Sequence, residues 1–501
     1  MLTFALIAFI VGNVLDKSRG DAADPASPLV LQNHPRIMEN CVEKFEGAEG
    51  AHMEGFQLQK VLVITTPGLQ TPQEHNGRAS IHDPGDHLHF CSFKKMSKYL
   101  DIGNYLNTLK IKEKFPNKKV KQAFKNLEPL PHVKHCGRHS LSSFGVLQLI
   151  NLGKYLWKSY FGKLKSLDSF VLSHKFASTF GDQTLFQSLS ALLYGLLNEK
   201  QFVYTHVDKL SSGFSTASQF KEEQQSLHYF VEQSFIKENH FFKNTKVYTF
   251  NRGYITDTPF GADISSKDVI SYLSNSLCPK SQNHEKALSI SYDGISHIFN
   301  LSDAYNNYLT ASSLFWSYSA FRTVSLWKLV KNWLSPNHIH FKHQTGNINS
   351  NDDLKVITVD DLFMFSILRT LNVSVARHTA PASRLIIESF VLQDSDSGLD
   401  SLNSKILSLE KLYKGVLSFP SLNKISTFNV YSQEKKSNYF TLPKKNNTAH
   451  KFVRLLYNGQ VITSFIPVCN SDKITTLGMC SLETFEHFLN NTIQLGMNVS
   501  S

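Results

Sequence analysis

The 501-residue sequence lacks the short motifs by which many enzymes are identified. It contains no Gly-x-Ser-x-Gly nucleophile elbow, no His-Glu-x-x-His zinc motif, no Walker loop and no glycine-rich dinucleotide fingerprint. These absences argue against the common serine hydrolases, zinc proteases, P-loop NTPases and dinucleotide-dependent oxidoreductases. We therefore expect neither a cofactor nor a metal.

Cysteine is scarce as well. The sequence has six cysteines, and no two of them form a Cys-x-x-Cys pair, which argues against a zinc ribbon or a thioredoxin-type site. An even number of cysteines in a secreted chain predicts disulfides, although six cysteines allow about 15 full pairings. Cys469 and Cys480 are close in sequence, so we predict that these two form one bridge.

Long hydrophobic runs are also missing. The N-terminal apolar run, Leu2 to Leu15, is shorter than the roughly 20 residues of a spanning helix. A mean hydropathy of −0.21 argues against a polytopic membrane protein. Residues 1–20 are therefore predicted to be a secretory signal peptide, with a short signal-anchor as the alternative because Lys17 and Arg19 follow the run.

Entry into the secretory pathway implies a luminal, membrane-anchored or secreted protein. Asn-x-Ser/Thr sequons fit a glycosylated luminal chain. They occur at Asn300, Asn372, Asn446, Asn490 and Asn498.

Charge is unbalanced, with a net value of +11 and a pI near 9.1. A lysine-rich stretch supplies part of the excess and is interpreted as a solvated face, or as a site for a polyanion such as a sulfated glycan. Its candidate residues are Lys110, Lys112, Lys114, Lys118, Lys119 and Lys121. A luminal location argues against a nucleic acid as the binding partner. The expected partners are a glycan or proteoglycan, or a luminal protein, with membrane contact only through the N-terminal anchor.

Apolar content is high enough for a large core, since 41% of the residues are hydrophobic and 12% are aromatic. Short β-branched runs predict strands, and apolar stripes at helical spacing predict helices between them. The strands are expected at 60–65, 169–173, 355–359, 384–391 and 452–459, and the helices after Cys136, through 189–197, at 361–371 and at 481–495. This alternation predicts an α/β fold, a central sheet with helices on both faces.

The chain divides into regions of different composition. Residues 21–55 are predicted to be a loosely structured lead-in, and residues 56–496 the main domain. Within that domain, 200–345 is expected to be an inserted, mostly helical cap, and the polar stretch 394–448 a flexible insertion.

Several collinear blocks between about residue 40 and residue 493 resemble the histidine acid phosphatase family. They include Gln187–Leu197, Pro381–Glu388 and Val453–Gly459. The resemblance implies a histidine-phosphatase-like sheet with a cap. It also implies a phosphomonoesterase site, in which a histidine attacks phosphorus, arginines bind the phosphate oxygens and an acid protonates the leaving group.

The signature of that family is Arg-His-Gly-x-Arg-x-Pro after the first strand. In this sequence Gly68 and Pro72 match it, whereas the first arginine falls on Thr66, the nucleophilic histidine on Pro67 and the second arginine on Gln70. Proline has no nucleophilic nitrogen, and threonine and glutamine carry no charge.

Two further parts of the family site follow later strands. The third arginine falls on Ser178, and the His-Asp pair falls on Asp360 and Asp361. Asp361 holds the proton-donor position, but it is also suited to be a helix N-cap or a first-turn carboxylate. Asp360 is expected to put negative charge where phosphate should bind.

Other Arg-His pairs do not restore the site. Arg138-His139 opens a predicted helix, and Arg377-His378 precedes a predicted strand, whereas the nucleophile should follow one. The sequence therefore predicts a catalytically inactive member of the family, a pseudophosphatase. The alternatives are an active phosphatase with an unrecognised nucleophile and a luminal glycan-binding module that uses the lysine-rich stretch.

Overall fold

The computed structural model describes the chain in segments. These are residues 33–42, 44–71, 90, 91, 93, 100–114, 128, 130, 131, 140–164, 177–179, 183–205, 208, 209, 246–251, 254–259, 266–278, 295, 296, 299, 300, 302, 303, 313–335, 353–373, 379–392, 451–470 and 477–499. The predicted leader at 1–20, the strand at 169–173 and the insertion at 394–448 lie outside them. No helix among the described residues is both long and apolar enough to cross a bilayer.

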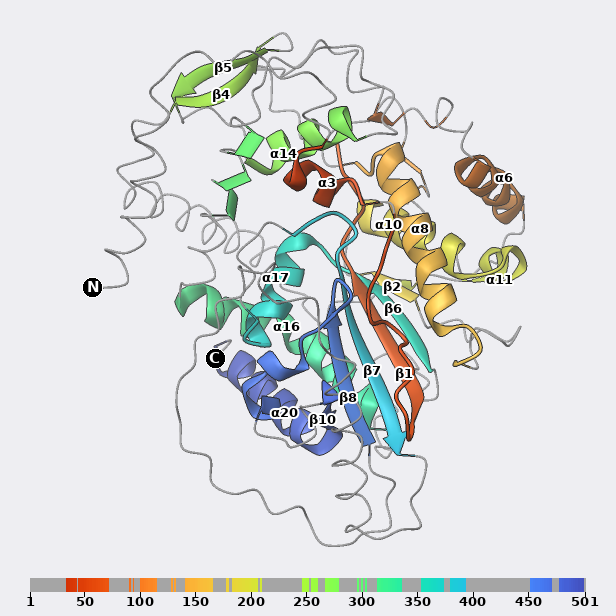
Figure 1. Ribbon diagram of the computed structural model, residues 1–501, viewed down its shortest axis with the longest axis vertical. Helices are drawn as coiled ribbons and strands as arrows, with labels where there is room; N and C mark the ends of the chain where they lie inside the picture. The colour runs from red at the N-terminus through yellow and green to blue at the C-terminus, as the bar shows by residue number, and fades with distance from the viewer. Residues whose placement is uncertain are drawn as a thin grey trace, which may run out of the picture.

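A mixed sheet forms the centre of the molecule, in the order β10-β8-β7-β1-β6-β2-β3, with β9 paired to β8 (Figure 1). Its parallel half is β1 (Phe56–Thr65), β6 (Leu354–Thr358), β2 (Ala177–Thr179) and β3 (Asp208–Lys209). Its antiparallel half is β7 (Arg384–Leu392), β8 (Lys451–Tyr457), β9 (Gln460–Val461) and β10 (Cys480–Ser481). β1 is therefore central, with a parallel neighbour on one side and an antiparallel neighbour on the other.

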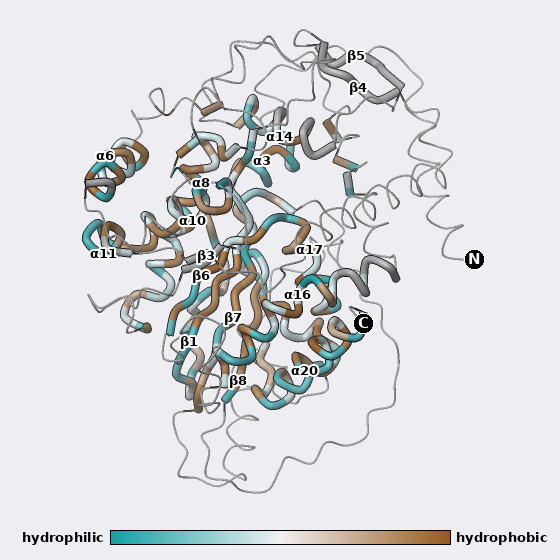
Figure 2. The backbone as a smooth tube through the Cα atoms, turned by 180° about the vertical axis from the view of Figure 1, so that it is seen from behind, coloured by the Kyte–Doolittle hydropathy of each residue, from teal (hydrophilic) through white to brown (hydrophobic). Residues whose placement is uncertain are grey.

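Helices cover both faces of this sheet, as the alternation of elements predicts. One face packs on α6 (Leu100–Lys114), α8 (Ser143–Tyr160), α10 (Gln183–Leu196) and α11 (Glu199–Tyr204), and the other on α16 (Ser313–Leu334), α17 (Asp361–Thr370) and α20 (Leu482–Val499). Successive strand residues point to opposite faces, so Val61 and Val63 enter the first core while Leu62 and Ile64 enter the second. The apolar colouring of the strands in Figure 2 reflects burial on both sides. The predicted α/β class is confirmed.

Local sequence explains where the helices begin. The Ser142 hydroxyl accepts a hydrogen bond from Gly145 N at 3.0 Å, which makes it the N-cap of α8. Asp360 caps α17 in the same way through Phe363 N at 2.7 Å, and Ser481 accepts from Thr484 N at 3.2 Å at the start of α20.

Smaller elements complete the described chain. α3 (Pro35–Asn40) and α14 (Ser266–Leu277) lie beyond the carboxyl ends of β1 and β6, with the hairpin of β4 (Lys246–Asn251) and β5 (Tyr254–Pro259) farther out (Figure 1). A short 3-10 helix, η4 (Thr463–Phe465), and the helix α19 (Pro467–Asn470) follow β9. The predicted bridge between Cys469 and Cys480 joins α19 to β10, with a Cα–Cα distance of 5.2 Å.

The region 200–345 differs from the expected helical cap. It contains the β4–β5 hairpin, and its last helix, α16, belongs to the core of the sheet rather than to a cap. Trp327 and Trp333 of α16 are fully buried together with residues of α17, α20 and β8. The polar composition of 200–345 as a whole hid this helix, which packs with α17, α20 and the sheet.

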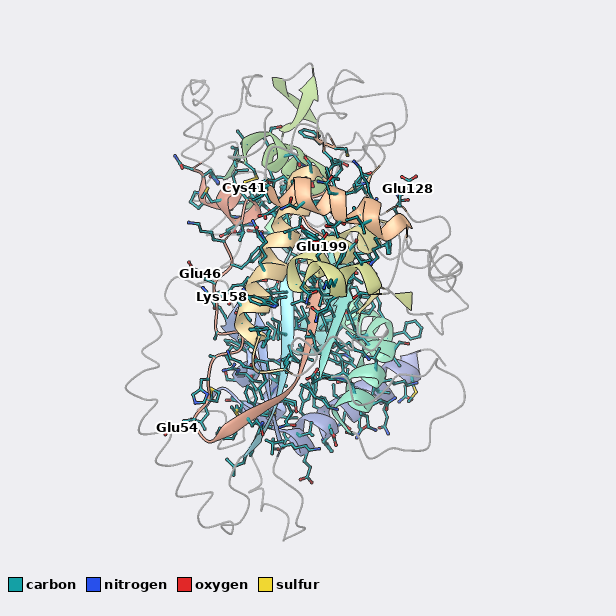
Figure 3. All side chains as sticks on the ribbon, turned by 90° about the vertical axis from the view of Figure 1, so that its right-hand side faces the viewer. Cys41, Glu46, Glu54, Glu128, Lys158 and Glu199 are labelled. Atoms are coloured by element: carbon teal, nitrogen blue, oxygen red, sulfur yellow. A yellow bond between two sulfur atoms is a disulfide. The ribbon has the colours of Figure 1, made fainter. Side chains whose placement is uncertain are left out.

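The lead-in is also more ordered than its composition predicts. From Cys41 past Glu46 to Glu54 it runs along the molecule and then turns into β1 (Figure 3). Glu49, in this segment, is fully buried and pairs with Arg384 of β7, the Nε–Oε1 distance being 2.6 Å. A segment rich in glycine, alanine and charged residues has the composition of a surface loop, but here the charged Glu49 is buried.

A second buried ion pair lies beside the first. Glu388 and Arg454 face each other across β7 and β8, with Oε2 and Nη2 2.5 Å apart and both side chains almost fully buried. Glu388 also accepts from Gly50 N and from the Tyr160 hydroxyl, each at 2.7 Å. Burial, and then the charge of Glu388, raise the pKa of Tyr160 well above its usual value, so the phenol stays a donor. The pair thus fastens the lead-in and α8 to the sheet.

We predict that Arg454→Met destabilises the protein strongly. It leaves the Glu388 carboxylate buried without its cation, which typically costs about 3–5 kcal/mol. Lys154→Met is the matched control, because the Lys154–Asp101 pair is half-exposed and its loss should cost less than about 1 kcal/mol. The free energy of unfolding in urea measures both. Equal losses for the two variants would contradict the role of the buried pair.

Candidate functional site

The carboxyl ends of three parallel strands lie level with one another. Thr65 of β1 and Thr179 of β2 are both in register with Thr358 of β6. In open α/β sheets ligands bind outside this edge. Because β7 is antiparallel to β1, with Arg384 opposite Thr65, the residues that precede β7 lie at the same edge.

A small pocket lies at this edge. Its walls come from α3, the loop after β1, α14, the start of α17 and the loop before β7. They are lined by Asn40, Pro67, Gly68, Leu69, Gln70, Ile270, Ser271, Asp361, Thr379 and Pro381. Its free space is about 20 Å³, enough for one or two water molecules.

The loop after β1 is held by hydrogen bonds to its neighbours. Thr66 N donates to Ser383 O at 2.9 Å, Leu69 N to the Gln148 side chain at 3.0 Å and Thr71 N to Ser140 O at 2.8 Å. These three amides are therefore already used within the protein. A loop that cradles phosphate instead turns its amides toward the anion.

Gly68, which matches the family signature, has a packing role. A Cβ at Gly68 would lie 2.3 Å from the carbonyl oxygen of Gly145 in the first turn of α8. Because no side chain fits there, glycine is required for the loop to approach α8, whether or not the pocket binds phosphate.

The structure brings Pro67, Gln70 and Asp361 together as pocket residues, as the resemblance implies. Thr66 is not among the residues that line the pocket, and it is fully buried, with its hydroxyl 3.4 Å from Ser383 O. Ser178 lies within β2 rather than after it, and its side chain, like Pro72, is outside the described residues.

Asp360 differs from its expected role. It does not line the pocket, and its carboxylate caps α17 and pairs with Arg322 of α16, at 2.7 Å from Oδ2 to Nη2. Its charge is thus directed to α16 and not into the pocket. Asp361 is the first residue of the helix, so its first-turn position agrees with the prediction.

The loop before β7 is the part of the site that sequence reasoning missed. Thr379 and Pro381 line the pocket, and Ala382 N donates to Pro67 O at 2.7 Å. Preceding a strand does not exclude a residue such as Arg377 or His378 from this edge, since the antiparallel strand β7 begins here. Arg377 and His378 themselves lie outside the described residues.

Hydroxyl groups gather behind this loop. Burial is the main cause that raises the pKa of Tyr457 to about 12, and the charge of Asp361 raises this pKa further. Hydrogen-bonding contacts with Ser383, Thr379 and Asn458 lower it. Tyr457 is therefore protonated at neutral pH. The hydroxyl of Thr379 is buried without a hydrogen bond of normal geometry among the described residues.

Other candidate residues are dispersed. Asn300 and Asn498 are exposed, Asn372 and Asn490 are half-buried, and Asn446 lies outside the described residues. Within the described residues no group of three His, Cys, Asp or Glu side chains could hold a metal.

The lysine-rich stretch is described only in part. Lys110 of α6 is exposed, Lys114 has no described side chain, and Lys118, Lys119 and Lys121 lie outside the described residues. Lys112 points inward, where its ammonium donates to Phe202 O and Thr205 O at 2.8 Å each and lies over the Phe202 ring. Lys112 is therefore a poor ligand for a polyanion.

Comparison with known proteins gives a likeness at the level of structure only. No protein-family model matches the sequence, and no curated protein is significantly similar to it. The chain is similar to the Hafnia alvei phytase (12% identity, TM-score 0.43, 88% of this chain and 98% of that one). It is also similar to the D. castellii phytase (12%, 0.44, 95% and 90%) and the Bifidobacterium longum multiple inositol polyphosphate phosphatase (9%, 0.39, 85% and 92%). These low values assign neither a family nor an activity.

We predict a pH-dependent contribution of Lys112 to stability. Burial lowers its pKa from 10.5 to about 8, so between these values the unfolded chain binds the proton and the folded chain does not. Stability should therefore rise with pH in this range relative to Lys112→Met. Urea unfolding at pH values from about 7.5 to 10 measures the slope. Lys110→Met, an exposed lysine on the same helix, should keep the wild-type slope, and an unchanged slope in Lys112→Met would contradict the burial of this ammonium.

Proposed function

We propose that this protein is a non-catalytic relative of the histidine acid phosphatases that binds a ligand at the carboxyl edge of its sheet. One observation carries the proposal. The pocket at that edge contains Pro67 and Gln70 where the resemblance requires a nucleophilic histidine and an arginine, and no described lining residue is an arginine, lysine or histidine.

The missing groups matter because of the chemistry. A covalent phosphohistidine route needs a ring nitrogen aimed at phosphorus, and loss of the nucleophile alone removes that route. Each lost donor to the transferring group typically costs a further 100- to 1,000-fold or so in rate. Asp361 keeps the position of the acid, but an acid without a nucleophile has no leaving group to protonate.

The nearest described arginines have other partners. Arg36 of α3 pairs with Glu39 and Asp303, and Arg322 of α16 pairs with Asp360. Arg384 and Arg454 are buried and paired with Glu49 and Glu388. None of these four lines the pocket.

The sequence blocks that resemble the family also resemble 2-phosphoxylose phosphatase, an enzyme that acts on phosphorylated xylose in the glycosaminoglycan linkage region. We propose on this ground that the ligand is a xylose-containing glycan or proteoglycan. The corresponding location is the Golgi lumen or another part of the secretory pathway. Two disulfides, Cys41–Cys278 and Cys469–Cys480, are consistent with an oxidising compartment.

The full-length protein should release no phosphate from xylose 2-phosphate or from p-nitrophenyl phosphate. The wild type, Asp361→Asn and His378→Ala should give the same background rate, because the pocket has no nucleophile to lose. Phosphate release is measured by colorimetry, with an active acid phosphatase as the positive control.

Turnover that disappears in Asp361→Asn would show an active enzyme and overturn the proposal. His378→Ala is included because His378 directly precedes Thr379, a residue of the pocket wall. Turnover lost only in His378→Ala would assign a nucleophile to the loop before β7, and it would overturn the proposal equally.

A further inference from the structure

We propose that His34 is a pH-sensitive latch, which fastens the start of α3 to the chain around Phe299 in neutral solution and releases it in acid. The inference does not depend on the proposed function, because it concerns the attachment of α3 whether or not the pocket holds a ligand. Three features support it: the hydrogen bonds of both ring nitrogens, the burial of the ring and the charge beside it.

The hydrogen bonds of His34 assign its neutral tautomer. The residue is the N-cap of α3, and its Nδ1 accepts from Arg36 N at 3.2 Å. A ring nitrogen that accepts carries no proton, so the proton of the neutral ring is on Nε2. Nε2 lies 2.8 Å from the hydroxyl oxygen of Ser296, to which it donates. The neutral ring therefore ties α3 to a residue 262 positions later in the sequence.

Protonation is incompatible with this arrangement. A charged imidazole is a donor at both nitrogens. Ser296 can still accept from Nε2, but the new proton on Nδ1 points at the N–H of Arg36, one donor against another. The ring is 2% exposed, so solvent compensates little for a charge at this place. The charged form therefore requires that the ring leaves or that the first turn of α3 opens.

The charges around the ring also favour its neutral form. Burial, and then the charge of Arg36, lower the pKa of His34 below its usual value of 6.5. His34 stacks on the Phe299 ring with 6.2 Å between centroids, and the Arg36 guanidinium lies 5.0 Å from the same centroid. The carboxylates of Glu39 and Asp303 are bound to Arg36, with N–O distances of 3.2 and 2.8 Å.

The other segments packed around Phe299 contribute uncharged groups where the structure describes them. The loop after β1 supplies Leu69, and α14 supplies Ile270, Leu273 and Leu277. The sign of the pH effect follows from the lowered pKa. Below about pH 6.5 the open latch takes up a proton that the closed latch excludes, so the closed form loses stability progressively as the pH falls.

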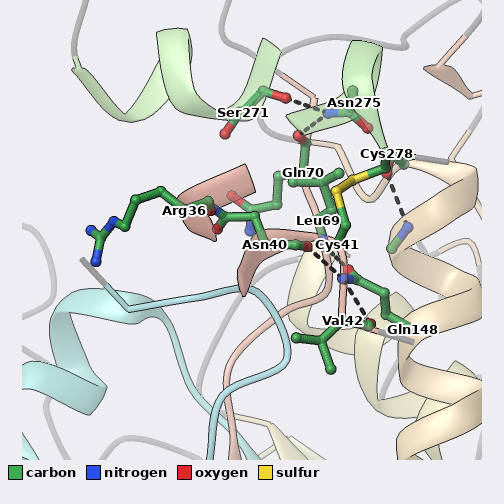
Figure 4. Close-up of a disulfide and its surroundings, with 12 residues drawn as sticks. Arg36, Asn40, Cys41, Val42, Leu69, Gln70, Gln148, Ser271, Asn275 and Cys278 are labelled. Atoms are coloured by element: carbon green, nitrogen blue, oxygen red, sulfur yellow. Dashed lines mark hydrogen bonds between the residues drawn. A yellow bond between two sulfur atoms is a disulfide. The ribbon is translucent and has the colours of Figure 1, made fainter. Parts of the chain in front are cut away.

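Release is confined to the start of α3, because its other end is held by groups that do not titrate. The disulfide Cys41–Cys278 joins the end of α3 to the end of α14 (Figure 4). The Gln148 amide donates to Asn40 O at 2.7 Å. Acid should therefore open the first turn of α3 and leave its last residues in place.

The latch is coupled to the pocket through Asn40. The side-chain amide of Asn40 donates to Arg36 O at 2.9 Å, and Arg36 N is the group that His34 caps. Asn40 also lines the pocket. When the first turn opens, Arg36 O moves away and the Asn40 amide becomes available to the pocket. Acid thus changes the polar groups that the pocket wall presents.

Hydrogen exchange of the full-length protein, measured by mass spectrometry at about pH 5, 6 and 7.5, tests the inference once each rate is divided by the intrinsic rate at that pH. The peptide of residues 35–41 contains Met38, whose amide donates to His34 O in the first turn of α3. It should exchange about 5- to 10-fold faster at the lowest pH than at the highest, the effect of a lost cap. A peptide of α8, residues 149–156, should keep its rate.

His34→Asn should remove the pH dependence, because asparagine also caps helices but does not titrate. Whatever its exchange rate at neutral pH, that rate should be the same in acid. His487→Asn is the matched control, an exposed histidine on α20, and it should behave as the wild type.

No acceleration of the 35–41 peptide in acid, or the same acceleration in His34→Asn, would overturn the inference. Equal acceleration of the α8 peptide would overturn it as well, because it would show unfolding of the whole domain in place of a local release.

Discussion

The antiparallel pairing of β7 with β1 is the constraint on which the rest of this structure depends. It places Arg384 opposite Thr65, so the chain that enters β7 and the chain that leaves β1 meet at one edge. Two backbone hydrogen bonds then join the loops, Thr66 N to Ser383 O and Ala382 N to Pro67 O. Without this pairing the pocket would lose the part of its wall that Thr379 and Pro381 form.

The same pairing organises the buried charges. Arg384 and Glu388 lie on β7, and each reaches a partner from another segment, Glu49 of the lead-in and Arg454 of β8. Desolvating four charged groups is expensive, so such pairs persist only where additional hydrogen bonds complete them. Gly50 N and the hydroxyls of Tyr155 and Tyr160 supply those bonds.

Arginine in the described structure thus serves the framework. Arg384 and Arg454 hold the lead-in on the sheet, and Arg322 neutralises the cap of α17. The pocket, in contrast, is lined by prolines, amides, hydroxyls and one carboxylate. Unrelated functions can be built on the same fold, so what this edge can bind depends on these lining groups.

The type of most elements, and with it the fold class, follows from local sequence. Periodicities of two and of 3.6 depend on neighbours in the chain, so β1, β6, β7, β8 and the starts of α8 and α17 could be predicted from apolar patterns and capping residues. The position of Asp361 in a first helical turn could also be predicted. A disulfide as local as Cys469–Cys480 was within reach for the same reason.

Which residues meet depends instead on long-range packing. The order of the lead-in depends on ion pairs between Glu49 and a strand more than 300 residues later, and composition carries no trace of such a partner. The role of Asp360 depends on Arg322 of another helix, and the membership of Thr379 in the pocket depends on the direction of β7. Strand direction and long-range pairing arise from packing of the whole chain, because local sequence fixes the type of an element but not its neighbours.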